Sequence, residues 1–270
     1  MKTGFYQFNP FFGKKEENLK KVLSAVKDTD LEFLVLPEFF ATGYQFASVD
    51  EVTELSENIS GGHTVEFLKD LSYEKGIYIA AGLAEREGDR FYNSAVLTGP
   101  DGLMGVYRKT HLFSEEKLYF TSGDTGFRVW DTKIGRIGIM ICFDWFFPES
   151  MRSLALSGAE VIAHPSNLVM PFCPDAMPVR CLENRVYAVT ANRIGVENRK
   201  KGHALTFIGK SQIVSPGGKI LTRASGDEEI LLVADIEPGS ARNKLLNPYN
   251  DIFKDRRPEE YGPLCKKTKS

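Results

Sequence analysis

The chain has 270 residues, of which 42% are hydrophobic, and a formal net charge of −2. This length and composition are enough for a substantial apolar core, in one large α/β domain or two smaller ones. Because the basic residues are not gathered on one predicted element, we expect neither a nucleic-acid partner nor an anionic membrane surface.

Other sequence features exclude further classes. No apolar run approaches the roughly 20 residues needed to span a bilayer, and the N-terminus shows no signal-peptide pattern. The cysteines at 142, 173, 181 and 265 are scattered, which does not suggest a disulfide framework. The four histidines form no H-x-x-x-H pair. We therefore expect a cytoplasmic protein with no metal site and no cofactor.

The chain opens with alternating strand-like and helix-like segments. A strand is predicted over Lys2–Phe8 and a helix over about 14–27, where apolar residues recur at helical spacing. A short buried strand over Phe33–Leu36 then ends at Pro37, which removes a donor from the strand ladder. Glu38 is therefore expected at the carboxyl end of a strand, which is where ligands bind in open α/β sheets.

The next elements lead to a second polar region. A helix is expected to end near Lys75, and Ile77–Leu83 is typical of a strand. Two strands over Phe91–Thr98 and Gly105–Lys109 are joined at Pro100-Asp101-Gly102, which is a strong turn signal. A polar loop that carries Glu115 and Glu116 is predicted to follow.

A cysteine stands at the end of the next predicted strand. Gly135–Ile141 is a near-continuous apolar run, as in strands buried on both faces, and Cys142 follows it. Asp144 marks a turn, and Pro148 is expected to open a helix over about Pro148–Ser157. A helix N-terminus favours negative charge, so we expect this position to favour a thiolate. The alternative is a buried cysteine that acts only as a small hydrophobe.

The last part of the chain repeats the layout around Glu38. A strand over Val161–His164 ends at Pro165-Ser166-Asn167, which suggests two similar halves packed face to face. The elements expected after it are a helix near Met177–Arg185, a strand over Tyr187–Ala191, a hairpin turn at 215–218 and a last strand over Ile230–Asp235. We interpret residues 1–270 as a single domain with a C-terminal tail over 245–270.

Three blocks of sequence, in this order, resemble the signatures of the nitrilase (carbon–nitrogen hydrolase) superfamily. They are Leu36-Pro37-Glu38-Phe39, Tyr107-Arg108-Lys109-Thr110-His111-Leu112-Phe113 and Ile141-Cys142-Phe143-Asp144. The resemblance extends over nearly the whole chain. It implies an α/β fold, a four-layer α-β-β-α sandwich, and a homodimer or higher homo-oligomer formed through the helical face. It also implies a catalytic triad of Glu38, Lys109 and Cys142, with Glu116 as a second glutamate.

These residue types suit the hydrolysis of an amide or nitrile. Cys142 would attack the carbon and Glu38 would act as general base. Lys109 and the backbone N–H of Phe143 would stabilise the oxyanion, and losing one such donor typically costs about 3–4 kcal/mol of barrier. Glu116 would position the substrate nitrogen or hold Lys109.

Other assignments stay open at this point. Our candidates for lining the substrate cavity are Tyr44, Phe143, Trp145, Phe146 and Asn167, although aromatic residues near strand ends are more often core and Asn167 can simply turn the chain. A cysteine–histidine pair is the main alternative to the triad, with His111 or His164 as base. His111 would share the face of Lys109 if both lay on one strand.

The residues after the cysteine indicate a substrate class. Nitrilases proper usually follow their cysteine with Trp-Glu, whereas this chain has Phe143-Asp144, as in the amidase and carbamoyl-amide branches. The block from Cys142 to Glu149 resembles that of N-carbamoylputrescine amidases. We predict hydrolysis of a small linear amide or N-carbamoyl compound, with a small nitrile as the second choice. The alternative from another class is a non-catalytic protein that binds a metabolite on the same fold.

Overall fold

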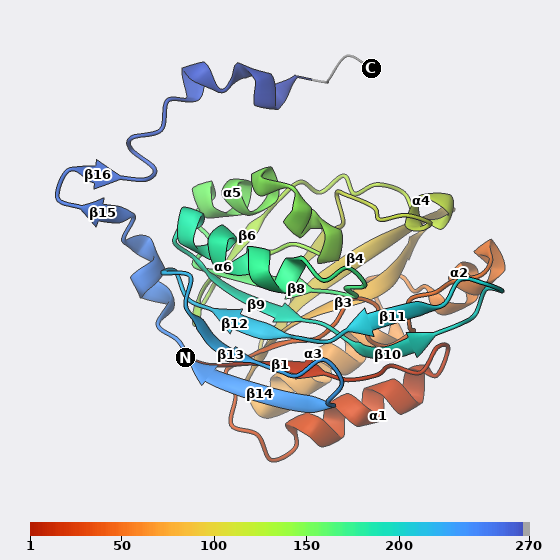
Figure 1. Ribbon diagram of the computed structural model, residues 1–270. Coiled ribbons are helices and arrows are strands. Elements are labelled where there is room, and N and C mark those ends of the chain that lie inside the picture. The colour runs from red at the N-terminus through yellow and green to blue at the C-terminus, as the bar shows by residue number, and fades with distance from the viewer. Residues whose placement is uncertain (267–270) are drawn as a thin grey trace.

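The chain folds into two six-stranded sheets that lie face to face (Figure 1). A computed structural model describes residues 1–266. The strands of the first sheet, in spatial order, are β14 (Ile230–Asp235), β1 (Lys2–Gln7), β2 (Phe33–Val35), β3 (Tyr78–Glu87), β4 (Arg90–Gly99) and β5 (Gly102–Arg108). Those of the second sheet are β13 (Ile220–Arg223), β12 (Gln212–Val214), β9 (Tyr187–Ala191), β8 (Val161–Pro165), β7 (Gly135–Ile139) and β6 (Val129–Thr132).

Each sheet has parallel strands at its centre and antiparallel strands at its edges. Strands β1, β2 and β3 are parallel in the first sheet, as are β7, β8 and β9 in the second. The expectation of two similar halves agrees with this arrangement, since β2 and β8 occupy equivalent central places and face each other.

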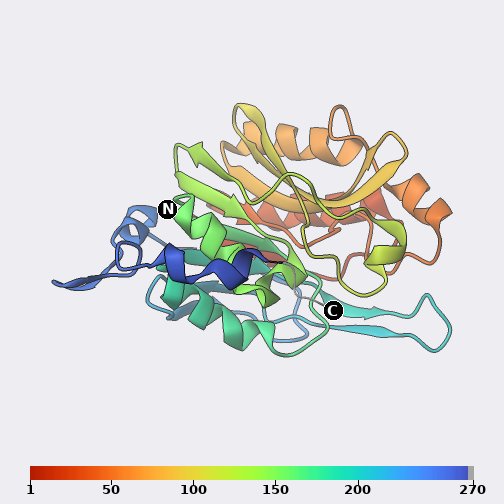
Figure 2. The same cartoon turned by 90° about the horizontal axis from the view of Figure 1, so that it is seen from above.

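Helices cover the outer face of each sheet, which makes four layers (Figure 2). The helices outside the first sheet are α1 (Lys15–Val26) and α3 (His63–Lys75), and those outside the second are α5 (Pro148–Leu156) and α6 (Cys173–Asn184). The predicted α-β-β-α sandwich is therefore confirmed. The shorter elements are α2 (Val49–Leu55), α4 (Glu116–Tyr119), four 3₁₀ segments η1 (Cys142–Phe146), η2 (Pro238–Arg242), η3 (Pro258–Glu260) and η4 (Gly262–Cys265), and two hairpins, β10 (Ile194–Glu197) with β11 (Leu205–Ile208) and β15 (Leu245–Asn247) with β16 (Asn250–Asp251).

Alternation along the central strands explains why their sequences are apolar throughout. In β2, Leu34 packs with the helical layer, whereas Val35 packs in the core between the sheets with Ile139. Successive side chains of a strand point to opposite faces, so a strand with both faces covered needs apolar residues at every position. Each fully buried side chain of this size contributes about 1.5–3 kcal/mol to folding.

Several elements differ from the sequence-based expectation. The helix predicted from Met177 begins earlier, at Cys173, because a proline in its first turn removes no helical hydrogen bond. The predicted polar loop contains one helical turn, which begins at Glu116. The β10–β11 hairpin was not expected, since its polar turn around Arg199 resembles any solvated loop.

The chain beyond β14 runs outside the sandwich (Figure 1). It returns to α5 where Phe253 packs 5.5 Å beneath the Arg152 guanidinium. The single domain over 1–270 with a tail from 245 stays a prediction, and residues 267–270 of that tail lie outside the described residues. None of the helices in residues 1–266 has both the length and the apolar character needed to cross a membrane.

Candidate active site

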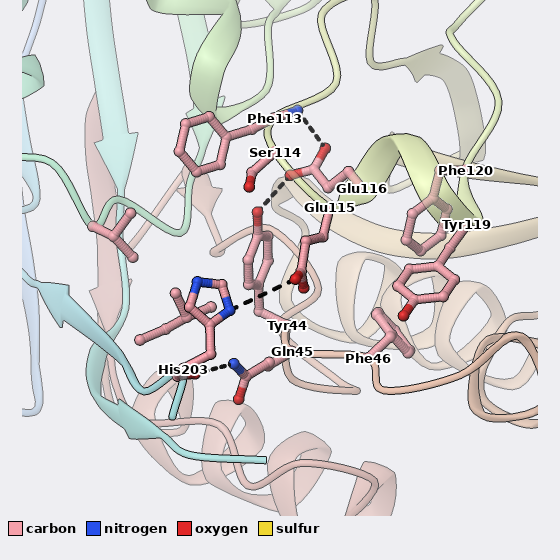
Figure 3. Close-up of a pocket in the computed structure, with 12 residues that line it drawn as sticks. Tyr44, Gln45, Phe46, Phe113, Ser114, Glu115, Glu116, Tyr119, Phe120 and His203 are labelled. Carbon is pink, nitrogen blue, oxygen red and sulfur yellow. Dashed lines mark hydrogen bonds and ion pairs between the residues drawn. The ribbon is translucent and has the colours of Figure 1, made fainter. Parts of the chain in front are cut away.

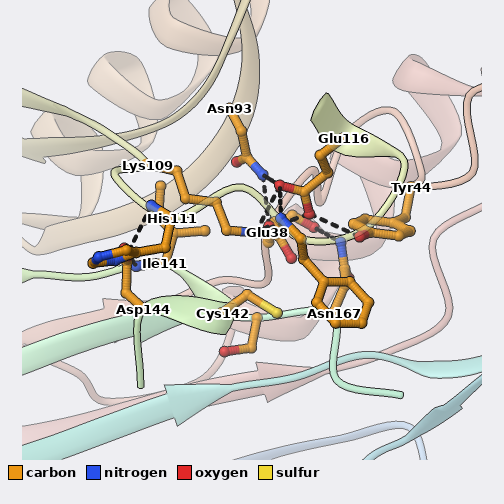
Figure 4. A network of polar contacts seen from close by, with 12 residues as sticks. Glu38, Tyr44, Asn93, Lys109, His111, Glu116, Ile141, Cys142, Asp144 and Asn167 are labelled. Atoms are coloured by element: carbon orange, nitrogen blue, oxygen red, sulfur yellow. Dashed lines mark hydrogen bonds and ion pairs between the residues drawn. The ribbon is translucent and has the colours of Figure 1, made fainter. Parts of the chain in front are cut away.

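Four strands end at one place in the sandwich, and each is followed by a predicted site residue (Figure 4). Glu38 follows β2, Lys109 follows β5, Cys142 follows β7 and Asn167 follows β8. All four side chains are buried. The fold therefore brings together residues that are far apart in the sequence, in a place shielded from water.

Lys109 lies between two carboxylates. Its Nζ is 2.7 Å from Glu38 Oε1 and 2.9 Å from each carboxylate oxygen of Glu116. Lys109 and Glu38 are completely buried and Glu116 nearly so. Such a buried cation is tolerated only because all of its donors have charged partners. Of the two adjacent glutamates in this loop, Glu116 contacts Lys109, whereas Glu115 pairs with Lys200.

Asn93 and Tyr44 complete the hydrogen bonding of the two glutamates. Asn93 Nδ2 donates to Glu38 Oε1 at 2.6 Å and to Glu116 Oε2 at 3.3 Å. The Tyr44 hydroxyl donates to Glu116 Oε1 at 2.7 Å. Sequence reasoning missed Asn93, although a lone amide in the apolar strand β4 is a usable signal. Glu38 Oε2 is buried and has no hydrogen-bond partner among the described residues.

Burial and charge set the protonation of this group. Burial raises the pKa of Glu38 above its ordinary value, although the positive charge of Lys109 acts in the opposite direction. Burial alone would lower the pKa of Lys109, but the negative charges of Glu116 and Glu38 outweigh it, so the pKa of Lys109 is raised. The lysine is therefore an ammonium ion at neutral pH, and Glu38 is a stronger base than a solvated glutamate.

The expectation that the position of Cys142 favours a thiolate is wrong. Burial, followed by the negative charge of Glu38, raises the pKa of the Cys142 thiol well above its ordinary value. Lys109 and the backbone N–H of Asn167 act in the opposite direction but do not offset these effects. The element that follows is a single 3₁₀ stretch, Cys142–Phe146, and not a long helix with an aligned dipole. The thiol keeps its proton until a base removes it.

The backbone at Cys142 is held in an unusual conformation. Its φ is +41°, in the left-handed region that non-glycine residues rarely adopt. Asp144 fixes this turn, because its Oδ2 accepts the N–H of Ile141 at 3.0 Å and the hydroxyl of Tyr107 at 2.7 Å. Its Oδ1 accepts the backbone N–H of His111 at 3.1 Å. Asp144 is therefore a positioning residue that the sequence marked only as a turn.

Neither histidine is placed to act as base for Cys142. The expectation that His111 shares a strand face with Lys109 is wrong, because β5 ends at Arg108 and the His111 ring turns to Asp144, with Nδ1 2.7 Å from Oδ1. His164 Nε2 lies 2.9 Å from the carbonyl oxygen of Cys142 and Nδ1 lies 3.0 Å from Thr190 Oγ1. Burial lowers the pKa of His164 to about 4, so it is neutral and both of its ring nitrogens are occupied.

Two adjoining cavities open beside the cluster, and Figure 3 shows residues that line the larger of them. The larger, which we call the aromatic cavity, has a volume of about 230 Å³, and its walls include Tyr44, Phe46, Phe113, Tyr119 and Phe120. The smaller, the cysteine slot, is bounded by Cys142, Phe143, Trp145 and Asn167. Phe113 and Val169 border both.

Most of the predicted cavity residues therefore lie where a substrate would meet Cys142. Tyr44 borders the aromatic cavity, and Phe143, Trp145 and Asn167 border the cysteine slot. Asn167 also holds the loop of Glu38, since its Nδ2 donates to the Glu38 carbonyl at 2.8 Å. Phe146 borders neither cavity and is half exposed.

Gly82 lies directly against the backbone of Glu38. A Cβ added there would be 2.5 Å from Glu38 Cα, which is a steric clash that the backbone must move to relieve. We expect Gly82→Ala to displace Glu38 and lower kcat by about 10²-fold, as misplacement by about 1 Å does elsewhere. Gly239→Ala is the matched control, because a Cβ there meets nothing within 4 Å. Steady-state kinetics test this, and an unchanged kcat in Gly82→Ala would contradict it.

The chemistry available here belongs to a class of enzymes, the hydrolases of carbon–nitrogen bonds built on a four-layer sandwich. The family model for carbon-nitrogen hydrolases matches residues 2–244, so this chain belongs to that family. No group of three or more His, Cys, Asp or Glu side chains within residues 1–266 is arranged to hold a metal ion.

Individual relatives agree with this assignment. The chain is 51% identical to a nitrilase of Pyrococcus abyssi, over 97% of this chain and 99% of that protein. It is 32% identical to an N-carbamoylputrescine amidase of Solanum tuberosum, over 91% and 87% of the two chains. The crystal structure of a carbon-nitrogen hydrolase from Helicobacter pylori G27 superposes with a TM-score of 0.88 at 28% identity, over 98% of both chains. These relatives favour an enzyme over the alternative of a non-catalytic binding protein.

Proposed function

We propose that this protein hydrolyses a small linear amide to a carboxylic acid and ammonia through a thioester on Cys142, or an N-carbamoyl compound to ammonia, carbon dioxide and an amine through the corresponding carbamoyl-cysteine. One observation carries the proposal. Glu38 accepts from Lys109 and Asn93 with one carboxylate oxygen, while its other oxygen is buried without a hydrogen-bond partner among residues 1–266, in the same cluster as Cys142, whose thiol has a raised pKa. A base with a free lone pair beside a protonated nucleophile suits nucleophilic catalysis.

The proposed reaction uses each of these groups in turn. Glu38 takes the thiol proton as the sulfur bonds to the amide carbon, and the Lys109 ammonium and the Phe143 N–H stabilise the oxyanion. Glu38 then gives the proton to the nitrogen, and the carbon–nitrogen bond breaks. Ammonia departs, and a thioester remains on Cys142. Water, deprotonated by Glu38, attacks the thioester and releases the acid while the thiol regains a proton. Glu116 would keep Lys109 in place.

Nitrile hydrolysis is the second candidate, because the relative that is 51% identical is named a nitrilase. The two are separated by measuring ammonia and acid released from a panel of amides, ureido compounds and nitriles. We expect turnover of amides, with a covalent acyl adduct on the protein in intact-mass spectra during the reaction. Turnover of nitriles alone would overturn the preference for amides.

We propose in addition that two copies of the chain associate through the face made by α5 and α6. Large apolar side chains are exposed there, at Leu156 on α5 and at Val179 and Leu182 on α6, and Phe172 precedes α6. Exposed apolar patches of this kind mark interaction surfaces. Sedimentation analysis should give a dimer or larger species, and Leu182→Asp should shift it toward a monomer. A monomeric wild-type protein would contradict this proposal.

A further inference from the structure

The aromatic cavity has the size and lining for an apolar group. Besides its five aromatic rings, Val169 and Leu205 border it. Its volume is about 230 Å³. An apolar cavity of about 150 Å³ is enough to hold a benzene ring, so the aromatic cavity has room for such a ring with a short alkyl linker. Since the cavity adjoins the cysteine slot, it is the natural place for the acyl chain of a substrate whose carbon reaches Cys142.

No cation stands ready in this cavity for a negatively charged chain. Among the described residues, neither a lysine nor an arginine borders the aromatic cavity or the cysteine slot. The buried cation Lys109, which contacts the cavity residue Glu116, is already paired with Glu38 and Glu116. A terminal carboxylate on the substrate would therefore be buried without a lysine or arginine to pair with, and the imidazole of His203 in the lining already faces Glu115. Burial of the carboxylate there is unfavourable.

A positively charged chain is disfavoured for a different reason. Within residues 1–266, Glu115 and Glu116 are the carboxylates that border the aromatic cavity, and Glu115 is already paired. Lys200 Nζ lies 2.6 Å from Glu115 Oε2, and His203 Nδ1 lies 3.7 Å from Oε1 (Figure 3 shows the His203 contact). The hydrogen bond from Lys200 also lowers the pKa of Glu115, which keeps the carboxylate ionised. This carboxylate is therefore already neutralised by Lys200 and is not free to pair with a cationic substrate.

Lys200 is held in this position by the turn of the β10–β11 hairpin. Its Nζ is 3.1 Å from the Tyr119 hydroxyl. The neighbouring Arg199 makes a two-pronged contact with Glu51, at 2.7 Å for each nitrogen, and its backbone N–H donates to the Gln45 side chain at 2.6 Å. Four contacts thus fix the turn beside the cavity, so the pairing of Lys200 with Glu115 is built into the fold.

We propose that the substrate of this site carries an uncharged, apolar acyl group, of about the bulk of a benzene ring with a short linker, and that amides with an ionised chain end are rejected. This inference rests on the proposed function. It refines the substrate class, because the lining of the cavity and the Lys200–Glu115 pair exclude diamine-derived and dicarboxylic acid-derived chains alike.

A matched set of amides tests the proposal. Hexanamide and 3-phenylpropanamide are neutral, 5-aminopentanamide ends in an ammonium group, and 4-carboxybutanamide ends in a carboxylate. We expect kcat/KM for both neutral amides to exceed that of both charged ones by about 10²-fold. A charged amide within about tenfold of hexanamide, or better than it, would overturn this inference while leaving the proposed function standing. If the protein hydrolyses none of the four, no other amide and no N-carbamoyl compound, both the proposed function and this inference are overturned.

A substitution at Lys200, which lies outside the cavity lining, provides a second test of the proposal. Lys200→Met keeps an unbranched stem over Tyr119 but removes the charge, which frees Glu115 for a cationic chain. We expect the ratio of kcat/KM for 5-aminopentanamide to that for hexanamide to rise about tenfold. The rise should be absent in Lys200→Met/Glu115→Gln and in Lys201→Met, which removes the adjacent exposed charge. An unchanged ratio in a Lys200→Met protein with normal thermal unfolding would show that this pair does not set the charge preference.

Discussion

Replacing Cys142 by alanine should lower kcat/KM by at least about 10⁴-fold, because the proposed mechanism places the covalent intermediate on its sulfur. The protein should remain folded, with a stability loss of about 1 kcal/mol, since only one small buried side chain is shortened. Ammonia release measures the activity, thermal unfolding measures the stability, and the acyl adduct should disappear from intact-mass spectra.

A second buried cysteine provides the control. Cys173 lies at the start of α6, is completely buried, and like Cys142 has a pKa raised by burial. Cys173→Ala should therefore match the stability effect of Cys142→Ala while retaining activity. More than about 1% of wild-type activity in Cys142→Ala would remove the cysteine from the mechanism.

The architecture was predictable because its signals are local. Runs of apolar residues that end in Pro37 and Pro165 mark buried strands and the points where they leave a sheet. The order of the signature blocks then identified the family, and with it the four layers. The sequence also placed Glu38, Cys142 and Asn167 at strand ends, which is where they are found.

The properties of the site depend on packing that no short stretch of sequence contains. The helix predicted after Cys142 suggests a thiolate, yet burial of the sulfur in the folded protein raises the pKa of the thiol instead. Asn93 joins two glutamates from a strand that reads as apolar, and Asp144 joins the cysteine turn to Tyr107. The Asn93 contacts form only when the strands of the first sheet are assembled, and the Asp144 contact only when the two sheets meet, so local patterns cannot reveal them.

The β10–β11 hairpin shows the same limitation on a larger scale. Arg193 is fully buried at its base, 4.1 Å from the Phe207 ring, and is paired with Glu197. Glu197 in turn accepts the backbone N–H groups of Tyr44, at 3.2 Å, and Gln45, at 2.5 Å. The β10–β11 hairpin, which was not predicted from the sequence, therefore holds Tyr44, whose hydroxyl donates to Glu116. In this way it supports the buried charges of Glu116 and Lys109 from a distant part of the chain.

Replacing Lys109 by methionine should have the largest effect on stability. The variant leaves two buried carboxylates, Glu38 and Glu116, without the cation that lies within 2.9 Å of both. Breaking a buried ion pair by removing one partner costs about 3–5 kcal/mol, and we expect a loss of that size in the free energy of unfolding near neutral pH. Turnover should also fall by about 10²–10³-fold, because the oxyanion loses its main charged donor.

The loss of stability should depend on pH in a defined direction. Burial already raises the pKa of Glu38 in the folded protein, and Lys109 opposes that rise, so its removal raises the pKa further. An acid whose pKa is higher in the folded state binds more protons there, and stability then falls as the pH rises from the unfolded to the folded pKa. Denaturant unfolding should show a smaller difference from wild type at about pH 5 than at about pH 8. A loss that is equal at both pH values would contradict this account.

A double variant separates the charge from the packing. In Lys109→Met/Glu38→Gln, the new amide oxygen can still accept from Asn93, and the new amide nitrogen takes the place of the unpartnered Oε2. Only Glu116 then remains charged, and it keeps the hydrogen bonds from Tyr44, Asn93 and Phe113. Stability should recover by about 1–3 kcal/mol relative to Lys109→Met while activity stays lost. Such a result would mean that the charge balance among Glu38, Lys109 and Glu116 holds this end of the sandwich together, independently of any part in catalysis.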